Sequence, residues 1–166
     1  MPVPDLLTAL RIADEFDLRI VLAGAAEAWR IPDVIKAAGV PVILGPAMAR
    51  SYSDPEGHDR SFANAAVLAD AGVPIAFSTG FEDYVPKVRI VLYEAAVAAA
   101  NGLGSDRAIQ ALTLGAARIL GIDKTTGSLE PGKSADLVVF DGDPFEYTTH
   151  VCSVIVRGTV QSRTCL

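Results

Sequence analysis

The sequence predicts an α/β fold followed by a small group of β strands. Up to Gly121, short apolar runs suited to buried strands alternate with helical stretches, several of which end at glycines. This alternation is typical of a parallel sheet with right-handed helical crossovers. Beyond that residue the chain changes to short β runs joined by turns. We therefore predict two regions, residues 1–121 and 122–166.

The N-terminal stretch is expected to form a helix and then a strand. Apolar residues from Leu6 to Phe16 mostly recur at steps of three and four, which makes one apolar helical stripe. Asp5 is placed to cap this helix. Arg19 to Ala23 ends in an apolar, β-branched run with the length of a buried parallel strand.

The next βα unit follows directly. A helix is expected over Trp29 to Ala38, where Pro32 is tolerated because it lies in the first turn and Gly39 ends the helix. Val40 to Leu44 is the next buried strand. The polar stretch from Gly45 to Ser61 is long for a connection in a compact domain, and we interpret it as a candidate binding loop or lid.

Three further helices and one strand complete the first region. A helix over Ala63 to Ala71 leads into a strand over Val73 to Ser78. The Ala-rich stretch from Lys87 to Asn101 is strongly helical. Ser105 is expected to cap a last helix that runs to about Leu120.

The second region is expected to be β structure. Runs at Leu137 to Phe140, Ser153 to Val156 and Thr159 to Ser162 read as strands, and Arg157-Gly158 suits a hairpin turn. Two or three such strands alone leave unpaired edges, which proteins usually cover by pairing with something else.

Composition excludes several classes of function. The net charge of −6 and the lack of clustered Lys and Arg argue against a nucleic-acid surface. We also expect no membrane span and no secretory signal, and therefore a cytoplasmic location. Cys152 and Cys165 form no metal-binding spacing and no evident disulfide framework, so we interpret them as a half-buried side chain and a terminal thiol.

Two segments carry a family resemblance. The run Gly127-Ser128-Leu129-Glu130-Pro131-Gly132-Lys133-Ser134-Ala135-Asp136 continues through Leu137-Val138-Val139-Phe140 to Asp141-Gly142-Asp143-Pro144. It resembles the late β-sandwich segment of the amidohydrolase superfamily, in its imidazolonepropionase-like and prolidase-like branch. The stretch from Ala108 to Gly121 is similar to the last barrel helix of that family.

The resemblance implies part of a (β/α) TIM-type barrel, with about strands six to eight and their helices, plus C-terminal strands of a small composite β-sandwich. A complete barrel needs about 200 residues or more, and this chain has 166. We therefore expect either a portion of a longer protein or a shortened relative.

The resemblance also implies a divalent metal, usually zinc, held at the carboxyl ends of the barrel strands. Only two ligand positions of the family fall within this chain. The histidine of strand six would lie near Ala23 or Gly24, and the aspartate of strand eight is replaced by Gly80. We therefore expect no catalytic metal and no cofactor.

Polar residues in loops after the expected strands are the remaining candidates for catalysis. Loops after parallel strands are where α/β proteins bind ligands. An alternative is that the residues after the last strand end that strand or cap a helix, and that a loop histidine is merely solvated. The candidates are Glu27, His58, Ser78, Thr79, Glu82 and Asp83.

Three functions follow as hypotheses. The first is a C-terminal portion of a hydrolase of carbon–nitrogen bonds in a small amide substrate, inactive as this chain alone. The second is a self-associating module, in which a homo-oligomer or a missing N-terminal half covers the exposed strands. The third is a flavodoxin-like small-molecule domain, although the chain has no phosphate loop. Residues expected at the self-association surface are Val138, Phe140, Val154 and Val156.

Overall fold

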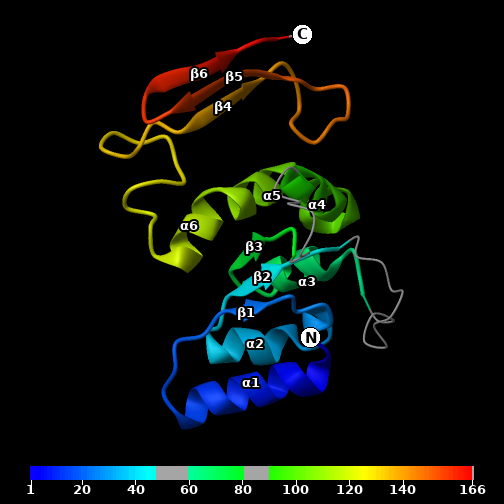
Figure 1. The fold of residues 1–166 in the computed structure, drawn as a ribbon. Helices are drawn as coiled ribbons and strands as arrows, with labels where there is room; N and C mark the ends of the chain where they lie inside the picture. Colours follow the sequence, from blue (N-terminus) through cyan, green and yellow to red (C-terminus); the bar gives the residue numbers. More distant parts are fainter. Residues whose placement is uncertain (48–59, 81–89, 166) are drawn as a thin grey trace.

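The computed structural model describes residues 1–47, 60–80 and 90–165, and it contains two separate three-stranded sheets (Figure 1). The first sheet is parallel and is surrounded by helices, and the second is antiparallel. This arrangement confirms the predicted α/β class. In the described part of the chain no helix is long and apolar enough to cross a membrane.

The parallel sheet has the strand order β1-β2-β3. Val42 in the central strand pairs with Leu22 on one side and Ile75 on the other. All three residues are buried and share one face of the sheet, whereas on the opposite face Ala23 is exposed and Ile43 is half-buried. The strands are β1 (Leu22–Ala23), β2 (Val42–Leu44) and β3 (Ile75–Phe77).

The helices occupy the stretches expected from the sequence, with differences at their ends and in their number. Helices α4, α5 and α6 contact β3, and α1 and α2 contact the short helix η1. The elements are α1 (Val3–Glu15), η1 (Ala28–Arg30), α2 (Pro32–Ala38), α3 (Asn64–Asp70), α4 (Val91–Ala98), η4 (Ala99–Leu103), α5 (Ser105–Leu112) and α6 (Leu114–Leu120).

Two predicted helix caps are wrong. Asp5 lies in the first turn of α1, and the capping position is Pro2. The N–H of Val3 instead donates to Glu27 Oε2 at 2.9 Å, so a side chain distant in sequence satisfies this helix end. Ser105 is likewise the first residue of α5, because the left-handed Gly104 (φ 80°) holds the capping position. The predicted end at Gly39 is confirmed by its φ of 66°.

The helix predicted from Ser105 to Leu120 is broken into two. Thr113 has φ −121° and ψ −101°, which is not helical, and its Oγ1 donates to the carbonyl of Ile109 at 2.7 Å. Just beyond the break, a Cβ on Gly115 would lie 2.8 Å from Gln110 O and 3.3 Å from Ile75 O. The break therefore brings α6 close to the backbone of β3, where a side chain would not fit.

A continuous apolar core lies around the parallel sheet. Leu6, Ile35, Val42, Leu68 and Leu103 are all 1% exposed or less. They come from α1, α2, α3 and η4 and from the central strand of the sheet. Phe145, which lies in the connection between β4 and β5, also packs against this core. The region of the antiparallel sheet is therefore in contact with the region of the parallel sheet.

The antiparallel sheet consists of β4 (Leu137–Phe140), β5 (Val151–Val156) and β6 (Thr159–Arg163). Arg157 and Gly158 have φ values of 50° and 76°, which confirms the predicted tight hairpin turn between β5 and β6. Several apolar side chains of this sheet are exposed, including Val138 at 47% and Val139 at 46%.

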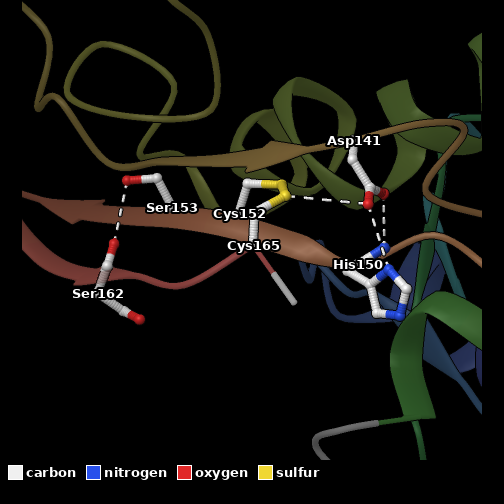
Figure 2. Close-up of a disulfide and its surroundings, with 6 residues drawn as sticks. All are labelled: Asp141, His150, Cys152, Ser153, Ser162 and Cys165. Carbon is white, nitrogen blue, oxygen red and sulfur yellow. Dashed lines mark hydrogen bonds and ion pairs between the residues drawn. A yellow bond between two sulfur atoms is a disulfide. The ribbon is translucent and has the colours of Figure 1, made fainter.

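Cys152 and Cys165 form a disulfide, so the interpretation of two separate thiols is wrong (Figure 2). Ser153 pairs with Arg163, and the N–H of Thr164 donates to the carbonyl of Cys152 at 3.1 Å. This antiparallel register leaves the two cysteine Cα atoms 4.0 Å apart. Composition and sequence spacing could not reveal that pairing.

Asp136 ties the start of β4 to the hairpin turn. Its Oδ1 accepts the N–H of Arg157 at 2.7 Å, and this bond, helped by a hydrogen bond with Ser134, lowers the pKa of Asp136 below its ordinary value of 3.8. A lowered folded pKa means that the ionised carboxylate stabilises the fold at pH values above 3.8. That contribution is lost as the pH falls through the folded pKa.

We predict that Asp136→Asn destabilises the chain at pH 7 and that the difference from wild type shrinks as the pH falls below about 4. Urea unfolding of both proteins at pH 7 and at a pH below about 4 measures this difference in the free energy of unfolding. Asp106→Asn, which removes an exposed carboxylate from the first turn of α5, is the control. A difference that is independent of pH would contradict the prediction.

Candidate functional site

The carboxyl ends of the three parallel strands meet at one edge of the sheet. Gly24 follows β1, and its N–H donates to Ile43 O at 3.0 Å. Gly45 follows β2, and the N–H of Ser78 after β3 donates to Leu44 O at 2.7 Å. The sequence singled out positions directly after the first and the third strand. The structure places both of these strand ends beside the end of the central strand β2.

A cavity of about 50 Å³ lies at this edge. Its walls come from the turns after β1 and β2, from β3, from the start of α3 and from α4. Its lining is mainly apolar, with contributions from Leu44, Phe62 and Phe77. The polar side chains that line it are Arg60, Ser61, Asn64 and Glu94.

Glu94 is the most deeply buried charged residue among those described, with 2% exposure. It projects from α4, and its Oε2 accepts the N–H of Ala47 at 2.6 Å, which fixes the turn after β2. Its Oε1 is buried and has no hydrogen-bond partner among the described residues. A buried acceptor without a partner is costly, so this oxygen is a candidate for contact with a ligand.

Asn64 adds a second acceptor to the cavity. Its Nδ2 donates to the carbonyls of Ala25 at 2.9 Å and Ala26 at 3.2 Å, which ties α3 to the turn after β1. This pairing leaves Oδ1 buried and without a partner among the described residues. Arg60 Nη1 donates to Pro46 O at 3.1 Å at the same edge. The two unpaired oxygens can accept N–H or O–H groups from a small ligand.

Of the predicted catalytic residues, the three that the structure describes do not line this cavity: Glu27, Ser78 and Thr79. Glu27 is buried, and its Oε2 accepts the N–H of Val3 at the start of α1 and lies 3.7 Å from Arg30 Nη1. Ser78 Oγ accepts the N–H of Gly80 at 3.0 Å, which stabilises the end of β3. Ser78 and its neighbour Thr79 are partly exposed and are not among the lining residues. Three candidates, His58, Glu82 and Asp83, lie outside the described residues.

The described residues at the strand ends do not fit a divalent metal. Gly24 and Gly80 offer no side-chain ligand, and their φ values of 66° and 73° are left-handed conformations that other residues rarely adopt. At Gly80 a Cβ would also lie 2.6 Å from the ring of Pro46. Among the described residues, the group with metal-ligand spacing consists of Asp141, Cys152 and Cys165, which belong to the other sheet.

Sequence reasoning missed the polar side chains of the cavity. Glu94 was one signal, because it is the single charged residue within the apolar segment Val91–Ala98. Asn64 and Arg60 gave none, because polar residues near the start of a helix are ordinary.

The comparisons with known proteins agree with this architecture. A family model described as the amidohydrolase family matches residues 30–162. The chain belongs to the amidohydrolase family. An amidohydrolase from Thermotoga maritima MSB8 superposes with a TM-score of 0.89 at 34% identity, covering 98% of this chain and 42% of that one.

Curated amidohydrolase relatives are imidazolonepropionases, as the sequence resemblance predicted. The protein from Geobacillus kaustophilus is 40% identical over 80 residues, which are 48% of this chain and 19% of that relative. The protein from Thermoplasma acidophilum is 24% identical over 134 residues, 77% of this chain and 31% of that relative. The chain thus spans less than a third of these two relatives.

Proposed function

We propose that this chain forms the C-terminal part of a hydrolase that acts on carbon–nitrogen bonds of a small amide substrate, with its cavity as part of the substrate site. The observation that carries the proposal is the pair of buried acceptors, Glu94 Oε1 and Asn64 Oδ1, for which the described part of the chain offers no hydrogen-bond partner. Both lie at the carboxyl ends of parallel strands, where such folds bind ligands. Family membership supports the reaction class.

In this proposal β1, β2 and β3 correspond to the sixth, seventh and eighth strands of a (β/α) barrel, and β4 to β6 are part of a small sandwich. The match of nearly the whole chain to 42% of the Thermotoga maritima amidohydrolase supports this correspondence. The remaining strands and the catalytic metal ligands would come from an N-terminal part. The described residues therefore bind and orient substrate, and they do not activate water.

The unpaired acceptors indicate which part of a substrate this wall would contact. An amide or ureide N–H is a donor, and a buried carboxylate oxygen is a strong acceptor for it. The cavity has room for only a few heavy atoms, so it would hold one end of a substrate. A cyclic ureide presents two N–H groups in such a compact shape.

We predict that the chain binds hydantoin and that Glu94→Gln weakens the binding by about 10- to 100-fold, the range expected for a charge-assisted hydrogen bond. The reason is that a glutamine has a single acceptor oxygen, so either Ala47 N–H or the ligand loses its partner. Titration monitored by the amide resonances of Ala47 and Ala65 measures the affinity.

Glu146→Gln, in the turn between β4 and β5, is the matched control and should leave the affinity unchanged. Unaltered binding in Glu94→Gln, with a folded spectrum, would show that this carboxylate does not contact the ligand. The flavodoxin-like alternative is tested separately by the visible absorbance of the purified chain. A stoichiometric flavin would favour that alternative.

A further inference from the structure

Four side chains that can bind metals or protons gather at one end of the antiparallel sheet (Figure 2). Asp141 directly follows β4, His150 directly precedes β5, Cys152 lies in β5 and Cys165 follows β6. Asp141, Cys152 and Cys165 each offer one ligand atom, and these atoms all lie within 4.8 Å of one another. Asp141 and Cys165 are exposed, so ions and small thiols can reach the cluster.

We propose that reduction of the Cys152–Cys165 disulfide turns this cluster into a zinc site formed by the two thiolates and the Asp141 carboxylate. Tetrahedral zinc with Zn–S bonds of about 2.3 Å and Zn–O bonds of about 2.0 Å places a sulfur and an oxygen ligand about 3.5 Å apart. The observed separation between Cys165 Sγ and Asp141 Oδ2 is 3.9 Å. The carboxylate is therefore already near its position, and opening the disulfide frees the two sulfurs to adjust.

His150 positions the carboxylate. Its backbone N–H donates to Asp141 Oδ1 at 2.7 Å, and its ring Nδ1 lies 3.2 Å from Oδ2. A hydrogen-bonded partner of this kind orients a ligating carboxylate. The group of mutually close ligand atoms does not include His150, so the fourth coordination position is left to water.

The step that opens the site is a two-electron reduction. A dithiol reductant supplies two electrons and two protons, the S–S bond breaks, two thiols form, and the reductant becomes a disulfide. Zinc then displaces the two thiol protons to solvent and forms two Zn–S bonds. In both states the residues after β6 stay linked to β5, first by the disulfide and then through the ion.

Soft thiolate ligands with a carboxylate favour Zn²⁺ over hard cations such as Mg²⁺ and Ca²⁺. The oxidised pair offers no thiolates, so binding depends on the redox state. The site is separate from the strand-end cavity and does not depend on the proposed hydrolase function. The expectation that the strand ends hold no catalytic metal is independent of this site.

The test compares the oxidised and the reduced chain, using competition with a chromophoric zinc chelator and Co²⁺ as a spectroscopic probe. We expect the reduced wild type to bind about one equivalent of zinc and to show thiolate-to-cobalt charge-transfer bands, and the oxidised wild type to show neither. Cys152→Ser and Cys165→Ser should each abolish the bands. His150→Gln should weaken zinc binding by about 10- to 100-fold.

Asp141→Asn should weaken zinc binding at least about tenfold, whereas the matched control Asp143→Asn, two residues away in the same turn, should not change it. The comparison of redox states needs no variant, so it remains decisive if a variant does not fold. Any of three results would overturn the proposal: no zinc bound by the reduced chain, equal binding by the oxidised chain, or equal binding by Asp141→Asn.

Discussion

Purified alone, the chain is expected to hydrolyse none of the substrates of its proposed class, with or without added zinc. Metal-assisted hydrolysis needs an ion that acidifies water and polarises the scissile carbonyl. The family resemblance places two metal ligands at these strand ends, and Gly24 and Gly80 have no side chain that could bind a metal there. Steady-state assays with hydantoin, a lactam and proline dipeptides measure the turnover.

A metal-free site is the rival to this prediction. In that hypothesis Glu82 or Asp83 acts as a general base on substrate held by the loop from Gly45 to Ser61. Turnover by wild type that falls at least about a hundredfold in Glu82→Gln or Asp83→Asn would establish this rival. The zinc-loaded reduced chain belongs in the same assay, because it tests whether the distant cysteine cluster has any activity of its own.

The purified chain is also expected to self-associate through one face of the antiparallel sheet, most simply as a symmetric dimer. Val138 pairs directly with Val154 across β4 and β5, so both side chains lie on the same face. Val138 is 47% exposed, and covering such apolar surface is favourable. Sedimentation equilibrium at micromolar concentration measures the mass.

Val138→Asp should raise the dimer dissociation constant at least about tenfold, because it would bury a charge at the interface. Val139→Asp is the matched control, since Val139 is equally exposed but points to the opposite face. A monomeric wild type, with cooperative unfolding that is independent of concentration, would exclude the dimer. In that case we would expect a segment other than a second copy of this chain to cover the Val138 face of the antiparallel sheet.

Much of the secondary structure could be predicted because it follows from local patterns. The strand of residues 137–140 follows from a short apolar, β-branched run between turn residues, and the hairpin follows from the glycine at position 158. Both signals are visible in sequence. The helix break at Thr113 could not be predicted, because it depends on the approach of Gly115 to β3. Propensity within residues 105–120 favours one continuous helix.

The candidate site was less predictable, because its polar residues are defined by burial. Glu27 looked like a loop acid at a strand end, yet it binds the start of α1, more than twenty residues away. Glu94 lies in an apolar helix, and only the packing of α4 against the turn after β2 shows that one of its oxygens is buried without a hydrogen-bond partner in residues 1–47, 60–80 and 90–165. Tertiary contacts of this kind leave no periodic trace in sequence.

Gly45 sets a limit on how this edge of the sheet can be altered by mutagenesis. Its φ is 126°, and a Cβ at this position would overlap the carbonyl oxygen of Ser78. The obstacle is main chain, so no change of a neighbouring side chain can make room for it. In a saturation library of this chain, position 45 would therefore select for glycine even where every residue that lines the cavity is free to vary.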